Sequence, residues 1–382
     1  RFLCGGLLGA GESNWLGSPG PAVYGAFRHD MLPPAQREII DGMEPLVATQ
    51  LELLDSAENC WQPSDYLPKS TGDNWPEQVR ELRDQAKSIP DELLVVLVGD
   101  MVTEEALPTY QSLLNGFEGV SDRSGSDASA WARWTRGWTA EENRHGDLLN
   151  RYLYLSGRVD LRAVEVTIQN LIIKGFDPGT TNNPYRGFVY TSFQERATKV
   201  SHHNVAKLAR AAGDETLQLI CNAIASDEAR HERAYTNFMG YLFEQDPAGA
   251  VLAFRDVLQN QIVMPAQNMG GAGEPDLFER FSAVAQRLGV YTTEHYAQIV
   301  AHLGLSSKAV TSVYAATIRT GDVVKLPIAA RTKLNLRNSH LSYAVTWYGI
   351  ALALIGVYLA FHHQAGRLSF GRGHEDDGGV QQ

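Results

Sequence analysis

The sequence predicts an all-α fold. Four long segments carry helix start or stop signals, and they span residues 93–115, 129–156, 187–212 and 214–243. Ser129 and Asp214 are suited to cap helix N-termini, while Gly157 and Gly213 follow two of the C-termini. No alternation of apolar and polar residues is long enough to demand a sheet, and no solenoid-type repeat is visible. We therefore expect one helical bundle over residues 31–305.

Composition supports a globular chain and excludes some functions. The 382 residues are 44% hydrophobic, which excludes general disorder. Lys and Arg number 33 against 44 Asp and Glu, and the net charge of −11 argues against nucleic-acid binding. Three separated cysteines, Cys4, Cys60 and Cys221, cannot build a disulfide framework. The cysteine pattern indicates a reducing compartment.

The two ends differ from the middle. Residues 1–30 are rich in Gly, Pro and Ser, and we interpret them as a disordered tail or the remnant of a leader. Residues 306–340 form a basic linker before an uncharged segment. Positive charge beside a membrane span favours the cytosol-like side, so we expect the linker to lie on that side. Residues 341–361 carry no charge and are long enough to cross a bilayer as a helix, with a buried core helix as the alternative. Residues 362–382 read as a solvated tail.

Two of the four long segments contain the motif Glu-x-x-His. Glu142 and His145 form the first pair, and Glu228 and His231 form the second. Residues three apart lie on one face of a helix, one turn apart. The rest of each face is apolar: Trp131, Trp134, Trp138, Leu149 and Tyr152 on the first, and Leu217, Ile224, Tyr235, Phe238 and Leu242 on the second. Both pairs are therefore predicted to point into the core.

Each motif is preceded by a single glutamate on a neighbouring long segment. Glu104 lies 38 residues before Glu142, and Glu195 lies 33 residues before Glu228, which suggests a duplicated helix pair. A buried carboxylate is unfavourable unless it is paired, protonated or bound to metal. Four carboxylates and two imidazoles suit iron or manganese and neutralise two divalent ions. This is the ligand pattern of ferritin-like di-iron proteins. Buried salt bridges without a metal remain the alternative.

Several neighbours of these residues have a second interpretation. Glu141 and Asp227 point about 100° away from the ligand face, so we expect them at the surface or just outside the ligands. Arg144 and Arg230 can pair with them. His202 follows Glu195 by two turns, and a hydrogen-bonded core histidine is favoured over a seventh ligand.

Longer strings resemble a known family, the soluble plant-type acyl-[acyl-carrier-protein] desaturases, of the stearoyl 9-desaturase type. The matching strings are CWQPSDYLP, VGDMVTEEALPTYQ, WTAEENRHGDLLNRYLYLSGRVD, PYRGFVYTSFQERAT, SDEARHE and FSAVAQRLGVYT, within residues 31–300. The resemblance implies a homodimer in the plastid stroma with two Fe²⁺ ions per chain. It also implies an oxidoreductase that uses O₂ and electrons from reduced ferredoxin. The product would carry a cis double bond, at the delta-9 position, in a saturated acyl chain held on acyl carrier protein.

The resemblance also assigns residues. It places the iron ligands at Glu104, Glu142, His145, Glu195, Glu228 and His231. It places an electron route at Trp61, Asp227 and His145, and it places Thr198 and Trp138 near the oxygen-binding side. For Trp61 and Trp138, ordinary core packing is the alternative. The substrate tunnel would be lined by Leu113, Gly116, Phe117, Pro178, Thr180, Gly187 and Phe188. Because Phe117 is larger than the aliphatic residue expected there, we predict a shorter tunnel and a preference for 16-carbon over 18-carbon chains.

The C-terminal part suggests a different origin. Residues 317–366 resemble the last membrane helix of the Surfeit-locus cytochrome oxidase assembly proteins, which would tether the chain to a membrane through 341–361. In that family the preceding segment lies outside the matrix or cytoplasm, which conflicts with the charge pattern. A genuine fusion and two joined reading frames both explain the match.

Three other functions remain open from the sequence. The first is a ferritin-like iron-storage protein, and the second is a membrane-anchored assembly protein that binds no iron. The third is radical chemistry of the ribonucleotide-reductase kind, which needs a tyrosine such as Tyr235 beside the metals.

Overall fold

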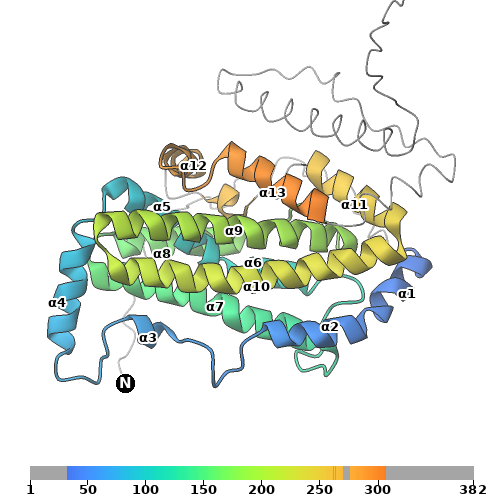
Figure 1. Ribbon diagram of the computed structural model, residues 1–382, viewed down its shortest axis with the longest axis horizontal. Coiled ribbons are helices and arrows are strands. Elements are labelled where there is room, and N and C mark those ends of the chain that lie inside the picture. The colour runs from blue at the N-terminus through green and yellow to red at the C-terminus, as the bar shows by residue number, and fades with distance from the viewer. Residues whose placement is uncertain (1–31, 261, 263, 270–275, 307–382) are drawn as a thin grey trace, which may run out of the picture. The chain divides into compact units, whose positions relative to one another are not determined.

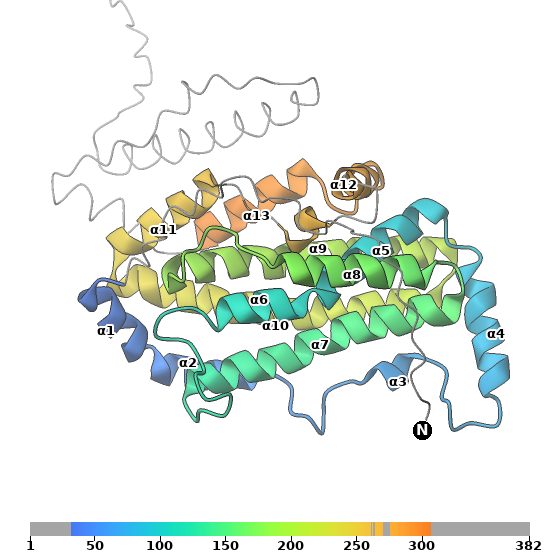
Figure 2. The ribbon, with the colours of Figure 1, turned by 180° about the vertical axis from the view of Figure 1, so that it is seen from behind.

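The computed structural model describes residues 32–306, except 261, 263 and 270–275, and this part is helical without strands. Its long helices are α5 (Asp91–Glu105), α7 (Ala130–Ser156), α9 (Pro184–Ala212) and α10 (Glu215–Gln245). Figure 1 shows α9 and α10 side by side, and Figure 2 shows α7 along the opposite face. The predicted all-α class is confirmed.

Shorter helices surround the long ones. They are α1 (Pro34–Gly42), α2 (Glu44–Gln50), α3 (Pro63–Tyr66), α4 (Trp75–Ala86), α6 (Leu107–Leu114), α8 (Leu161–Lys174), α11 (Pro247–Gln259), α12 (Leu277–Arg287) and α13 (Thr293–Ser306), with 3₁₀ turns at Leu51–Leu53 and Pro265–Asn268. Of these, α11 and α13 pack on α9, and α12 packs on α5 (Figure 1).

The predicted helix boundaries follow the capping residues. The Ser129 hydroxyl accepts a hydrogen bond from the Ala132 amide at the start of α7, and Asp214 accepts one from the Leu217 amide at the start of α10. Gly157 and Gly213 end α7 and α9 at φ of 65° and 86°. Only glycine adopts this left-handed conformation without strain, which is why these helices end there.

The predicted single helix 93–115 is two helices, because the chain breaks at Ala106 between α5 and α6. Pro108 has no amide hydrogen to donate to the Glu104 carbonyl, and its ring would clash with that carbonyl in a continuous helix. The Tyr110 hydroxyl donates to the same carbonyl at 2.9 Å instead. The break therefore places Glu104 in the last turn of α5.

The apolar core has two main clusters, one toward each end of the bundle. Along α7, Trp131 and Trp138 belong to one cluster, whereas Leu148 belongs to the other. Along α10, Ile224 and Phe238 divide in the same way. The Glu-x-x-His motifs lie between the two clusters on both helices. The fold thus buries its charged residues at mid-length, with apolar packing on either side.

Part of the predicted organisation lies outside the described residues. This applies to the leader 1–30, to the linker beyond residue 306, and to the membrane span 341–361. Within the described ranges, every helix is too short or too polar to cross a bilayer.

We predict that Asp214→Ala destabilises the protein more than a similar change at another helix cap. Asp214 is buried, caps α10 and accepts a hydrogen bond from the Tyr152 hydroxyl at 2.5 Å. Losing the cap and leaving a buried hydroxyl unpaired lowers the free energy of unfolding by about 2–4 kcal/mol. Asp160→Ala removes only the exposed cap of α8 and lowers it by about 1 kcal/mol. Urea denaturation measures both, and equal losses would contradict the prediction.

Candidate metal centre

Four helices bring the six predicted ligands together at the centre of the bundle. Glu104 comes from α5 and Glu195 from α9, while α7 and α10 each contribute one Glu-x-x-His pair. All six side chains are buried, with at most 4% of any residue exposed. The inward orientation predicted from the apolar helix faces is therefore what the structure shows.

The six residues form two overlapping groups. One group contains Glu104, Glu142, His145 and Glu228, and the other contains Glu142, Glu195, Glu228 and His231. Within each group the candidate ligand atoms lie within 4.8 Å of one another. Glu142 and Glu228 belong to both groups, so the two groups share these carboxylates. Each group then has one terminal glutamate and one histidine of its own.

Both histidines direct the same ring atom at the carboxylates. His145 Nδ1 lies 3.4 Å from Glu142 and 3.5 Å from Glu228. His231 Nδ1 lies 2.7 Å from Glu142 and 3.4 Å from Glu195. Despite these short distances, neither Nδ1 atom makes a contact of hydrogen-bond geometry among the described residues, and neither does Glu142 Oε1. Buried polar atoms are rarely left unpaired, so these three atoms fit a metal site.

The outer nitrogen of each ring is held by a carboxylate from the opposite helix. His145 Nε2 lies 3.3 Å from Asp227 of α10, and His231 Nε2 lies 2.9 Å from Glu141 of α7. Such partners fix the tautomer and leave Nδ1 to face the metal. Glu141 and Asp227 are each only 2% exposed. The expectation that these two residues lie at the surface is therefore wrong. Both are buried, just outside the candidate ligands.

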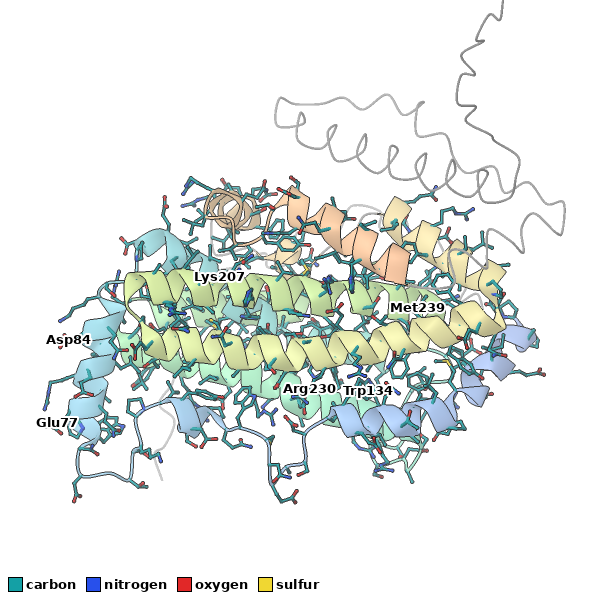
Figure 3. The ribbon with its side chains drawn as sticks, in the orientation of Figure 1. Glu77, Asp84, Trp134, Lys207, Arg230 and Met239 are labelled. Carbon is teal, nitrogen blue, oxygen red and sulfur yellow. The ribbon has the colours of Figure 1, made fainter. Side chains whose placement is uncertain are left out.

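Two arginines neutralise the outer carboxylates, as the sequence indicated. Arg230 lies 2.5 Å from Asp227 and 3.1 Å from Glu141, and it also donates to the Leu53 carbonyl. Figure 3 labels Arg230 on α10. Arg144 contacts Asp227 at 3.2 Å. Arg230 thus joins the two outer carboxylates and links them to the segment before α3.

The two terminal glutamates have different supports. His202 Nε2 lies 2.8 Å from Glu104 Oε1. The Trp138 indole donates to Glu195 Oε1 at 3.0 Å. Each contact involves Oε1 of the glutamate. The other oxygen, Oε2, lies near a candidate ligand histidine, His145 for Glu104 and His231 for Glu195. The predicted core role of His202 fits this contact.

Burial and close contact shift the pKa values of several of the six residues. Burial and repulsion from Glu142 raise the pKa of Glu228 well above 4.5. Burial opposes ionisation of Glu104 as well, but contacts with His145 and His202 outweigh it and lower the pKa of Glu104 to about 2. Burial likewise opposes protonation of His145 and His231, yet the carboxylates raise both pKa values well above 6.5. Two divalent cations would offset this accumulation of negative charge.

The three residues of the predicted electron route are adjacent. The Trp61 indole donates to Asp227 Oδ2 at 3.1 Å, and the same oxygen lies 3.3 Å from His145. The Trp61 and His145 rings are stacked with centroids 6.0 Å apart. Arg144 lies over the Trp61 ring at 4.7 Å, and Trp61 itself is half-buried. These contacts form a continuous path from a partly exposed indole to a candidate ligand.

A cavity of about 60 Å³ adjoins the carboxylates. Glu104, Glu142, Glu195 and Glu228 form part of its wall, and most of the exposed lining is apolar. The other lining residues are Thr103, Tyr110, Leu113, Leu114, Trp138, Tyr190, Thr191, Gln194, Thr198, Met264 and Pro265. The cavity therefore connects the candidate metal centre to a mostly apolar space.

Of the seven predicted tunnel residues, Leu113 lines this cavity and the other six lie outside its lining. Thr180, Gly187 and Phe188 are buried, Pro178 is half-buried, and Gly116 is exposed. The Phe117 ring lies against Gly187, where an added Cβ would come within 2.2 Å of it. Gly187 is one helical turn before Thr191, which does line the cavity. Phe117 thus fills the space that a side chain at residue 187 would occupy.

Sequence reasoning missed much of the cavity wall. Thr198 and Trp138, which the resemblance placed near the centre, do line the cavity. Thr191 lies one helical turn before Glu195 and Gln194 lies one turn after Thr191, so the position of Glu195 could have identified them. Met264 and Pro265 come from a loop far along the chain, and no local pattern predicts their approach. Tyr235 hydrogen-bonds with Trp134 at 3.4 Å and is absent from the cavity lining.

Comparisons with known proteins identify the family. A family model described as fatty acid desaturase matches residues 35–315. Stearoyl-[acyl-carrier-protein] 9-desaturase 5, chloroplastic, from Oryza sativa subsp. japonica is 55% identical over 287 residues, covering 75% of this chain and 73% of the relative. Acyl-[acyl-carrier-protein] desaturase, chloroplastic, from Cucumis sativus is 56% identical over 286 residues, covering 75% and 72%.

A solved structure of DesA2 from Mycobacterium tuberculosis H37Rv matches 72% of this chain and 99% of its own, at 18% identity and a TM-score of 0.48. The family model alone spans well over half of the sequence. This chain belongs to the fatty acid desaturase family.

Proposed function

We propose that this chain is an acyl-[acyl-carrier-protein] desaturase, an oxidoreductase that introduces a cis double bond into a saturated acyl chain. The observation that carries the proposal is a buried set of two overlapping ligand groups beside a mostly apolar cavity. The names of the relatives support the delta-9 position and a plastid location. Electrons come from reduced ferredoxin, the oxidant is O₂, and the enzyme acts as a homodimer.

The proposed cofactor is a pair of iron ions held by Glu104, Glu142, His145, Glu195, Glu228 and His231. When bound, it supplies oxidising chemistry, which is needed because a mid-chain alkyl C–H bond is not acidic enough for a protein base. The protein's own task is to exclude water and hold one pair of carbons toward the centre. The apolar lining of the cavity and the buried position of the carboxylates suit that task.

The other site residues have distinct proposed roles. Trp61 and Asp227 carry electrons toward His145, since their side chains are in contact. Thr198 and Trp138 lie on the cavity side of the centre, where O₂ and the acyl chain meet. Phe117 closes the far end of the substrate space against Gly187.

The rival functions explain less of the structure. An iron-storage protein has no need of an apolar cavity beside the carboxylates, and a scaffold for assembly has no need of two ligand groups. The relatives named above are desaturases and favour neither rival. Radical chemistry would require Tyr235 beside the metal ions. Among the described residues, the Tyr235 hydroxyl is hydrogen-bonded to Trp134, and no hydrogen bond joins it to a candidate ligand.

The proposal predicts metal-dependent desaturation. The purified chain is loaded anaerobically with iron and then given stearoyl or palmitoyl carrier protein, reduced ferredoxin and O₂. We expect two irons per chain and an unsaturated product, detected by mass spectrometry, and chelation of the iron should abolish product formation. Two irons without product would favour storage, and a chain that takes up no iron would refute both functions.

Phe117→Leu should shift chain-length preference from 16 toward 18 carbons. The smaller side chain opens space against Gly187, and discrimination by an apolar pocket changes by about tenfold for such differences in size. The ratio of kcat/KM for the two acyl chains measures the shift. Phe243→Leu makes the same change elsewhere in the same apolar cluster and should leave the ratio unaltered. An unaltered ratio in Phe117→Leu would refute the assigned role.

Trp61→Phe should slow turnover driven by ferredoxin by about tenfold or more, because it removes a hydrogen bond to a charged carboxylate on the proposed route. Iron content and product yield after chemical reduction in a single turnover should stay near the wild-type values. Tyr66→Phe, which alters the ring packed edge-on against Trp61, is the matched control. Equal losses under both modes of reduction would argue against an electron route.

A further inference from the structure

The terminal glutamates of the two ligand groups are supported by chemically different side chains. Glu104 is contacted by the imidazole of His202, whereas Glu195 accepts from the indole of Trp138. Each support leaves one carboxylate oxygen, Oε2, near the Nδ1 atom of the histidine in its own group. The two groups match in their ligands but differ in what holds those ligands.

His202 lies where α9 can serve both groups. It follows Glu195 by seven residues, two helical turns, and therefore projects from the same face of α9. Its side chain reaches across to Glu104 of α5, with 1% of the residue exposed. The neighbouring His203 is exposed. Helix α9 thus supplies a ligand to one group and a support to the other.

Glu104 depends on such a support more than a mid-helix glutamate does. It lies in the last turn of α5, which ends at Glu105 because of the break before Pro108. Its backbone carbonyl is held by the Tyr110 hydroxyl, but this contact does not orient the carboxylate. A glutamate side chain has several rotatable bonds, and a hydrogen bond at Oε1 selects the rotamer that leaves Oε2 inward.

We propose that His202 is a positioning residue for Glu104. The affinity of the Glu104–His145 group for metal then depends on the His202–Glu104 contact, whereas the affinity of the Glu195–His231 group does not. The inference deepens the proposed function, since it rests on two metal ions binding at this centre. It concerns metal affinity and therefore has a readout separate from desaturation.

The test is a titration of the metal-free protein with Co²⁺, followed by calorimetry and by the visible absorption of the bound ion. The wild-type chain should bind two ions. In His202→Leu, one of the two dissociation constants should rise by about 10–100-fold, the range found when an outer partner of a metal ligand is lost. The other constant should remain near its wild-type value.

Two further variants separate positioning from packing. His202→Gln should recover much of the affinity, because its amide N–H can occupy the place of the imidazole Nε2–H. His203→Leu changes the exposed neighbour on the same helix and should leave both constants unaltered. Thermal melting of each metal-free variant reports any loss of stability.

A double variant assigns the weakened ion to its group. In a Glu104→Gln background, adding His202→Leu should not change the remaining dissociation constant, because the ligand it positions is already altered. A further loss in that background would overturn the inference. So would wild-type affinity in His202→Leu, or equal weakening of both ions with a lower melting temperature.

These outcomes also distinguish the inference from the proposed function. If the wild-type chain binds two ions and His202→Leu matches it, the inference fails while desaturation remains to be judged by its product. If the wild-type chain binds no metal ion, the proposed function fails and the inference fails with it.

Discussion

The burial of four carboxylates at one point is the constraint on which the rest of this structure depends. Glu104, Glu142, Glu195 and Glu228 lie within two overlapping groups at the centre of a helical bundle. Isolated buried carboxylates are strongly unfavourable, so they need cations, protons or donors around them. His202 and Trp138 contact one oxygen each of Glu104 and Glu195, and the remaining carboxylate oxygens face one another where metal ions would offset their charge.

The hydrogen bonds that hold the two histidines are arranged crosswise, which couples helix packing to the geometry of the site. A carboxylate of α10 holds the histidine of α7, and a carboxylate of α7 holds the histidine of α10. Arg230 contacts both carboxylates. A shift of one helix against the other would therefore disturb both histidines together. Apolar clusters on either side of the centre resist such a shift because close-packed side chains do not slide freely.

The proposed selectivity of this centre depends on the cavity beside it. An oxidising cofactor does not itself choose one carbon among many similar ones, so the choice depends on how the protein holds the chain. The cavity wall brings together α5, α6, α7, α9, α10 and a loop after α11. The absence of a side chain at Gly187, one helical turn before the lining residue Thr191, makes room for Phe117. The proposed limit on chain length therefore depends on packing between α9 and the segment after α6.

The all-α class, the six candidate ligands and the capped ends of the long helices could be predicted from the sequence, because helical periodicity and capping are local. It also carried the family resemblance. It did not reveal the break at Ala106, where Pro108 overrides a continuous apolar pattern. The packed helices were needed to show that Glu141 and Asp227 are buried and hold the histidines, and that His202 contacts Glu104. They also show which residues from distant segments enclose the cavity. These features depend on contacts between helices, and no local pattern encodes which side chains of two packed helices will meet.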